Sequence, residues 1–188
     1  MTVENALKCR NDNEEHKAIK TALNNILEPL KPWPWLSLIL VLLYEKFTPH
    51  SDWAPYFTVA PYEFDTLIWW TPEELKELQA SAVVNKIGKR EADHMFRDKV
   101  VPIVLENAGL FGYKKEEHGG REEWARTILQ EAHLMASMIM AYGFDLEPET
   151  REVDEDGYAT EDEDADLPKA IVPLADMLNA DADRNNVR

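Results

Sequence analysis

Apolar residues recur at helical spacing in three long segments of the chain. Residues 14–28, EEHKAIKTALNNILE, gather alanine, isoleucine and leucine on one face, and this pattern predicts an amphipathic helix that ends at Pro29. Residues 34–47 are apolar on nearly every side, which predicts a buried helix. Residues 121–142 repeat apolar positions every three or four residues and predict a third, longer helix.

The intervening segments carry more local signals. TPEE at 71–74 combines a capping threonine, a proline at the first helical position and a glutamate that completes a capping box, so a helix is predicted to begin there and to run to about residue 79. A further helix is predicted over 89–107, bent by Pro102. Residues 50–70 are rich in proline and aromatic residues and predict an extended, packed segment, while 112–120 predict a charged loop.

Strand signals are scarce, and TVEN at 2–5 and FTVA at 57–60 are the best short candidates. The pattern as a whole therefore predicts an α+β fold that is mostly helical. A hydrophobic content of 45% fits a globular chain, and the single Cys9 excludes an internal disulfide and fits a reducing compartment. The longest apolar run, residues 35–44, is about half of the roughly 20 residues that a membrane span needs, so no membrane association is expected.

Negative charge is concentrated in one segment. The formal net charge is −16, and residues 145–166 contribute −11 of it through twelve acidic residues and Arg151. Such a segment with few apolar residues predicts a disordered acidic loop over 145–168. A solvated linker is the favoured interpretation of this loop, and electrostatic attraction of a basic partner is the alternative. No basic patch is present, which argues against nucleic-acid binding.

The sequence contains no complete motif for a metal site, a catalytic nucleophile or a phosphate-binding loop. Asp181, Asp183 and Asn185 match the opening of a calcium loop, but the required glycine and the bidentate glutamate do not follow, and the five histidines lack zinc-ligand spacing. No metal site is therefore predicted, and no nucleophile or phosphate-binding motif is present. Asp176 and Asn179 share one face of a helical turn and could bind an ammonium group and a heterocycle edge, although spacing alone favours a plain asparagine-rich helix end.

Four motifs in order resemble the SET-domain protein lysine methyltransferases. The branch in question includes SETD6, the fungal ribosomal-protein lysine methyltransferases and the plant Rubisco large-subunit methyltransferase. The segments that carry the resemblance are PWLSLILVLLYEKF followed by SDWAPYF, then LIWWTPEELKEL, then MAYGFD, and finally PLADMLNADADRNN. They cover about residues 33–188, and the last segment is similar to the Asp-x-x-Asn-His signature of that family.

The resemblance implies a partial SET domain dominated by its helical insertion. Residues 1–144 would form the SET portion with the insertion, 145–168 the acidic loop, and 169–188 the start of the C-terminal SET segment. The cofactor implied is S-adenosylmethionine, and the reaction is methyl transfer to a lysine of a basic protein, such as a ribosomal protein or a histone-like protein. The family also implies a monomer and a nuclear location, with the cytoplasm as the alternative.

Site residues carry over by position in the motifs. The resemblance implies that Asn179, the backbone of Ala180 and Tyr142 contact the cofactor. Asp176, Asp145 and Trp70 would then lie near the channel for the substrate lysine. Some positions of the family pattern carry a different residue in this chain or have no counterpart in it.

Three departures from the family pattern stand out. Ala180 replaces the family's histidine, the glycine-containing cofactor strand is absent before residue 1, and the catalytic tyrosine would lie beyond Arg188. No catalytic residue is therefore assigned in this chain, and Asn185 is expected to stabilise the knot-like core by hydrogen bonds. The chain looks truncated at both ends, and a catalytically inactive SET fragment that acts as a protein-binding module is the alternative function.

Overall fold

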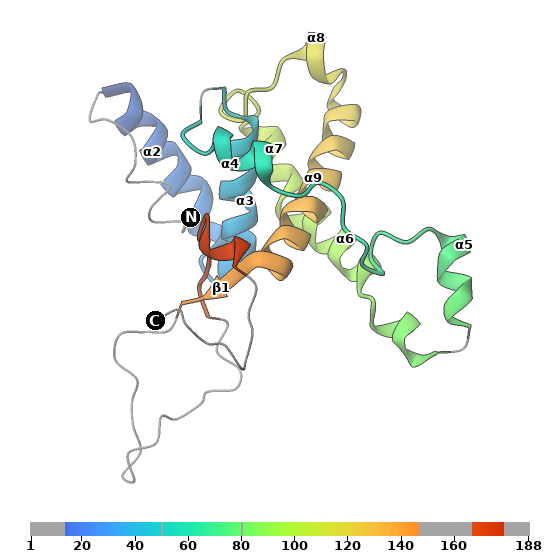
Figure 1. Ribbon diagram of the computed structural model, residues 1–188. Coiled ribbons are helices and arrows are strands. Elements are labelled where there is room, and N and C mark those ends of the chain that lie inside the picture. Colours follow the sequence, from blue (N-terminus) through green and yellow to red (C-terminus); the bar gives the residue numbers. More distant parts are fainter. Residues whose placement is uncertain (1–13, 50, 80, 147–166, 179–188) are drawn as a thin grey trace.

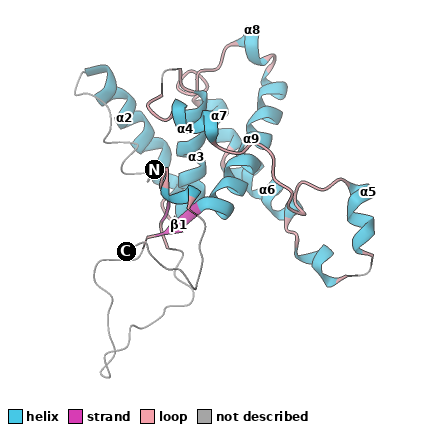
Figure 2. Ribbon diagram, viewed as in Figure 1, coloured by secondary structure: helices cyan, strands magenta, loops and turns pink. Residues whose placement is uncertain are grey.

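The computed structural model describes residues 14–49, 51–79, 81–146 and 167–178. Within these ranges the fold is mostly helical with one small two-stranded sheet, as Figure 2 shows, and this confirms the predicted mostly helical composition. The elements in chain order are α2 (Glu14–Leu27), η1 (Glu28–Leu30), α3 (Pro34–Phe47), α4 (Ala54–Val59), α5 (Pro72–Leu75), η2 (Lys76–Leu78), η3 (Ala82–Lys86), α6 (Lys89–Lys99), α7 (Val101–Glu106), α8 (Lys115–His118), α9 (Arg121–Tyr142), β1 (Gly143–Asp145), β2 (Lys169–Ile171) and η4 (Ala175–Met177).

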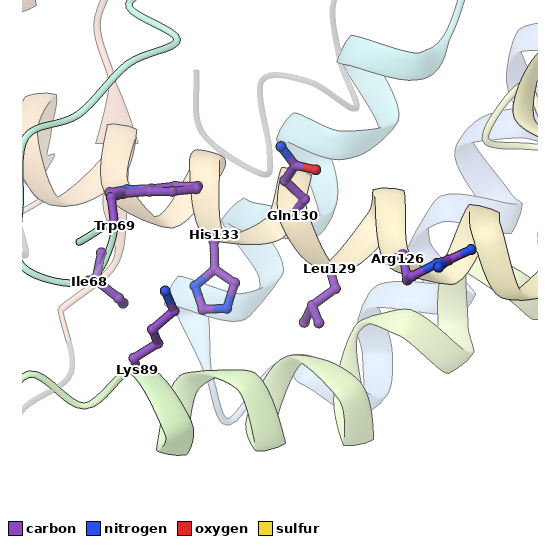
Figure 3. A pocket seen from close by; sticks show the side chains of 7 residues that line it. All are labelled: Ile68, Trp69, Lys89, Arg126, Leu129, Gln130 and His133. Carbon is purple, nitrogen blue, oxygen red and sulfur yellow. The ribbon is translucent and has the colours of Figure 1, made fainter. Parts of the chain in front are cut away.

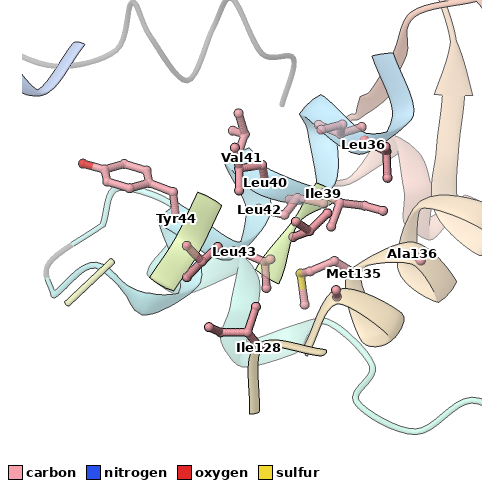
Figure 4. Packing of buried hydrophobic residues seen from close by; sticks show 14 of the residues in the cluster. Leu36, Ile39, Leu40, Val41, Leu42, Leu43, Tyr44, Ile128, Met135 and Ala136 are labelled. Carbon is pink, nitrogen blue, oxygen red and sulfur yellow. The ribbon is translucent and has the colours of Figure 1, made fainter. Parts of the chain in front are cut away.

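The core forms where α3 packs against α9. Figure 4 shows α3 side chains meeting Ile128, Met135 and Ala136 of α9, and all three of these α9 residues are buried. Because α3 is buried on nearly all of its faces, it forms the centre of the molecule rather than an outer layer. Helices α6 and α7 cover α9 from another side, and β2 contacts both α3 and α9. In Figure 1, α9 runs from α8 to β1, so the end of α9 leads directly into the sheet.

A partly buried ion pair also joins the two central helices. Lys46 Nζ of α3 lies 2.5 Å from Glu131 Oε2 of α9, and it also lies 4.6 Å from the centre of the Tyr62 ring. The buried carboxyl group of Glu45 accepts a hydrogen bond from the Ser51 hydroxyl, which ties the end of α3 to the start of the next segment. These charged groups near the core are therefore paired, as burial requires.

The sequence correctly predicted the main helices. Residues 34–47 and 121–142 form α3 and α9 with the predicted bounds, and the predicted helix at 14–28 is α2 followed by one turn of 3-10 helix. The capping box at Thr71 is present, because the Thr71 hydroxyl accepts from the Glu74 N–H while the Glu74 carboxylate accepts from the Thr71 N–H. The predicted helix over 89–107 is divided into α6 and α7, with the break just before Pro102.

Three local predictions were wrong. Residues 50–70 are not extended throughout, because Ala54–Val59 form α4, and the strand predicted at 57–60 lies mostly in this helix. Proline in the first turn favours the start of α4, and Phe57 is buried in the core. The loop predicted at 112–120 contains the single turn α8. The other predicted strand, at 2–5, lies outside the described residues.

The described part of the chain contains no helix that is both long enough and apolar enough to span a lipid bilayer. Most of the acidic segment, residues 147–166, lies outside the described residues, so the predicted loop over 145–168 stays a prediction. The residues on either side of 147–166 are described, and they pair as the two strands of the sheet. Strand β1 (Gly143–Asp145) precedes that range and β2 (Lys169–Ile171) follows it.

Candidate functional site

The short sheet joins the end of α9 to the segment that carries Asp176. Strands β1 and β2 are antiparallel, with Gly143 opposite Ile171 and Asp145 opposite Lys169. Gly143 makes this junction possible, because a Cβ atom there would lie 2.5 Å from the backbone oxygen of Ile139. The chain can therefore turn from helix into strand only with glycine at this position. The pairing brings residues on both sides of the acidic segment to one place.

Asp176 is held by a side chain from a distant part of the sequence. The Tyr56 hydroxyl of α4 donates a hydrogen bond to Asp176 Oδ2 at 2.8 Å, across 120 residues of chain. The backbone N–H of Asp176 donates to the carbonyl oxygen of Val172 at 3.0 Å, which forms the turn that presents the carboxylate. Asp176 Oδ1 is buried and has no hydrogen-bond partner among the described residues. One carboxylate oxygen is thus fixed, and the other is left as an acceptor.

Aromatic side chains pack around Tyr56, the residue that donates to this carboxylate. The Tyr56 ring lies 6.0 Å from Trp53 and 5.9 Å from Phe57, in edge-to-face arrangements. Burial, followed by the hydrogen bond to Asp176 and its negative charge, raises the pKa of the Tyr56 hydroxyl above its ordinary value. Tyr56 is therefore protonated at neutral pH and acts as a donor. A carboxylate that is bonded to an aromatic side chain and keeps one unpaired oxygen is a suitable environment for a cationic group.

Tyr142, a predicted cofactor contact, lies at the end of α9 in the same region. Its ring lies 6.5 Å from the ring of Phe64, and its hydroxyl is close enough to Tyr56 to contribute to the raised pKa of that residue. The structure therefore brings Tyr142 and Asp176 together around Tyr56. Tyr56 lies in the SDWAPYF segment, but the sequence does not indicate its role, because 120 residues separate it from Asp176.

Asp145 and Trp70 occupy different positions relative to this centre. Asp145 lies at the end of β1, where it accepts a hydrogen bond from the Lys169 ammonium group across the sheet. Trp70 lies just before α5, and its indole N–H donates to Asp65 Oδ1 at 3.0 Å. In Figure 1, α5 and β1 lie on different sides of the molecule. Among the described residues, no hydrogen bond or ring contact joins Trp70 to Tyr142, Asp145 or Asp176.

Asn179, Ala180 and Asn185 lie outside the described residues, so the cofactor contacts predicted for the first two stay predictions.

Large apolar side chains are exposed in and near the sheet, in the part of the chain that carries Asp176. These are Phe144, Val172, Leu174 and Leu178. Within the described residues, no group of three or more His, Cys, Asp or Glu side chains is placed to hold a metal ion.

Three curated relatives show what this chain is similar to. It is 34% identical over 160 residues to Ribosomal lysine N-methyltransferase 4 of Saccharomyces cerevisiae, a match that covers 81% of this chain and 30% of that protein. It is 31% identical over 157 residues to N-lysine methyltransferase setd6 of Xenopus laevis, covering 80% and 31%. It is 47% identical over 84 residues to the chloroplastic Ribulose-1,5 bisphosphate carboxylase/oxygenase large subunit N-methyltransferase of Pisum sativum, covering 42% and 16%.

No protein-family model and no solved structure matches the chain. The curated matches confirm the resemblance to the lysine methyltransferase branch that the four motifs indicated, since all three relatives carry the name of an enzyme of this type. The chain spans only about 30% of the length of the first two relatives.

Proposed function

We propose that this chain, a relative of protein-lysine N-methyltransferases over about 80% of its length, forms part of an S-adenosylmethionine-dependent enzyme that methylates lysine on a basic protein. The observation that carries this proposal is the Asp176 carboxylate. Tyr56 fixes one of its oxygens, and the other is buried without a partner among the described residues. A carboxylate in this state favours a cation, and both a lysine ammonium group and a methylsulfonium group are cations.

The roles of individual residues follow from the family motifs. Asn179 and the backbone of Ala180 would bind the cofactor, and Tyr142 would complete the same pocket. Asp176 would hold the substrate ammonium group with Tyr56 behind it as a positioning residue. Asp145 would lie near the lysine channel, where it already holds the ammonium group of Lys169.

Trp70 would flank the same channel. In the structure its indole is bonded to Asp65, so its assignment rests on the LIWWTPEE motif alone. A partial SET domain with a helical insertion is the fold that these assignments require. The helical majority of the described chain is consistent with such an insertion.

When bound, S-adenosylmethionine supplies a methyl group activated by a positively charged sulfur. The residues of the site would have to hold the substrate lysine close to this methyl group, and the lysine amine would have to give up its proton before it could accept the methyl group. The protein's contribution is therefore positioning and the removal of water. Asp176 would orient the ammonium group of the substrate, and the Tyr56 ring would shield one side of the carboxylate from water.

The proposed substrate is a basic protein, such as a ribosomal or histone-like protein. The relatives named above include an enzyme whose name specifies ribosomal lysine. The acidic segment, with a net charge of −11, would attract such a protein at low ionic strength. We place the reaction in the nucleus, with the cytoplasm as the alternative.

Transfer of a tritiated methyl group tests this function. The protein that carries this chain is produced at its full natural length and incubated with labelled S-adenosylmethionine and either total ribosomal proteins or core histones, and labelled residues are identified by mass spectrometry. Methyl-lysine is expected, and Asp176→Asn should reduce the initial rate at least about tenfold, because the amide cannot balance the ammonium charge. Asp98→Asn, which changes an exposed acid of α6 outside the proposed methyl-transfer site, is the matched control. Equal rates in both variants would contradict the assignment of Asp176.

A protein-binding role without catalysis is the second candidate. It is favoured by the exposed apolar side chains Phe144, Val172, Leu174 and Leu178 beside the sheet, since such a group suits contact with another protein segment. Specific capture of a basic protein by the chain without any methyl-lysine formation, in the presence of S-adenosylmethionine, would support this candidate over the enzyme.

A further inference from the structure

A separate pocket lies between the segment before α5, the start of α6 and the middle of α9. Figure 3 shows this pocket, which has a volume of about 190 Å³. Ile68, Trp69 and Leu129 form its apolar walls, and His133, which is only 8% exposed, forms its floor. None of these residues belongs to the proposed methyl-transfer site around Asp176.

The walls are held in place by hydrogen bonds. The Trp69 indole N–H donates to Ser137 Oγ at 2.9 Å, which fixes the ring against α9. His133 Nε2 lies 2.5 Å from Asp93 Oδ1 of α6, and the Trp69 and His133 rings meet edge to face at 6.2 Å. A pocket with fixed walls loses little conformational entropy when a ligand enters.

Two cations stand at the rim. Lys89 and Arg126 are exposed, and within the described part of the chain neither has an ion pair or a side-chain hydrogen bond. In Figure 3, Lys89 projects from α6 toward His133 of α9. Arg126 lies further along α9, and Gln130 lies on that helix between His133 and Arg126. Asp93, the nearby acid on α6, is already engaged by His133. The rim is therefore positive in a protein whose net charge is −16.

A larger apolar pocket adjoins this one. It has a volume of about 400 Å³ and shares Ile68 and His133 with the first pocket, and it extends along α9 to Met140. Together the two pockets form an apolar surface that suits a large apolar side chain carried by an extended ligand. A basic ligand would be repelled by Lys89 and Arg126, so the lysine-rich substrate proposed above does not fit here.

We propose that this pocket is a docking site for an acidic segment of a partner protein that carries one large apolar side chain. The apolar side chain fills the space between Trp69 and Leu129 as a buried anchor. Carboxylates on both sides of it pair with Lys89 and Arg126. A protein partner is favoured because positive charge and apolar surface are combined at one pocket. A ligand that used only one of these two features would bind weakly.

Fluorescence anisotropy tests the proposal with a fluorescein-labelled peptide, Gly-Glu-Glu-Phe-Asp-Asp-Gly, in physiological salt. The intact chain is expected to bind it, and the same peptide with alanine in place of phenylalanine should bind about tenfold more weakly or worse, because the anchor is lost. The double variant Lys89→Glu/Arg126→Glu should weaken binding of the parent peptide at least about tenfold. Circular dichroism melts check that the variants fold.

The matched control is Lys20→Glu/Lys115→Glu. It changes two exposed cations on α2 and α8 by the same total charge, and neither helix lines the pocket. Because charges beyond about 8 Å are screened at this salt concentration, binding should change less than about twofold. Equal weakening in both double variants, or equal binding of the alanine peptide, would overturn the proposal.

The chain's own acidic segment is the competing occupant. Peptide binding that is absent in the intact chain and appears only after deletion of residues 147–166 would assign the pocket to that segment and overturn the proposal of a partner. The measurement contains no S-adenosylmethionine and reads no methyl transfer. Its failure would therefore leave the proposed enzymatic function unaffected.

Discussion

Replacing Tyr56 by phenylalanine removes one hydroxyl group and keeps the ring. The deleted group is the donor at 2.8 Å from Asp176 Oδ2, and Asp176 Oδ1 has no partner among the described residues, so the carboxylate would lose its one side-chain hydrogen bond in that part of the chain. A hydrogen bond to a charged group contributes about 1.5–3 kcal/mol. Because Asp176 is half-buried, we expect the lower end of this range, a loss of about 1.5 kcal/mol in the free energy of unfolding.

Urea denaturation followed by circular dichroism at pH 7 measures this loss. Tyr62→Phe is the matched control, because the Tyr62 hydroxyl donates to a neutral acceptor, the carbonyl oxygen of Phe57. The control should cost only about 0.5–1 kcal/mol, the ordinary net contribution of a neutral hydrogen bond. Equal losses in the two variants, or no loss in Tyr56→Phe, would refute the idea that a charged carboxylate anchors this contact.

The same comparison has a defined pH dependence. Burial and Asp176 raise the pKa of Tyr56 in the folded state, so the protonated hydroxyl is favoured by folding. Its contribution is fully present below the ordinary tyrosine pKa of about 10 and is lost as the pH rises above it. The stability difference between the wild type and Tyr56→Phe should therefore stay constant from about pH 7 to 9 and shrink above about pH 10. A difference that is as large at pH 11 as at pH 9 would refute the assigned cause.

Three other predictions concern packing, backbone and charge. Leu42→Ala, at a fully buried position, should cost about 2–5 kcal/mol in urea unfolding, whereas Leu174→Ala, at a position 81% exposed, should cost less than about 0.5 kcal/mol. Gly112→Ala should cost more than about 1 kcal/mol, since its φ is +66° and a Cβ there would lie 2.6 Å from a backbone oxygen of α3; Gly109→Ala meets nothing within 4 Å and should melt close to the wild type. Hydrogen bonds from the α5 cap hold the pKa of Glu74 below its usual range, so amide-exchange protection of α5 should persist at pH 5 and disappear as the pH falls below about 4.

The long helices were predictable because their signals are local. Apolar spacing and a proline at the first turn were enough to give both ends of α3, and the capping box at 71–74 appears in the structure with both reciprocal hydrogen bonds. Helix α4 was missed because aromatic and β-branched residues in a proline-rich segment mimic extended structure, and the packing of Phe57 into the core decides the outcome.

The sheet and the centre of the candidate site could not be found by local reasoning. Strands β1 and β2 are three residues each, and their pairing spans the acidic segment between them. The hydrogen bond between Tyr56 and Asp176 connects two motifs that sequence reasoning had quoted separately. Contacts between such distant positions depend on how α3 and α9 pack, so the motifs suggested the kind of site while only the structure shows which side chains meet.

Isothermal titration of the intact chain with S-adenosylmethionine tests the central claim most directly. We expect measurable binding that Asn179→Ala weakens by a few-fold or more, while Asn107→Ala, which removes a side-chain hydrogen bond to Ile103 at the end of α7, leaves it unchanged. No binding to the folded chain, or equal binding by the Asn179 variant and the wild type, would contradict the assignment of a methyl-donor site to this part of the molecule.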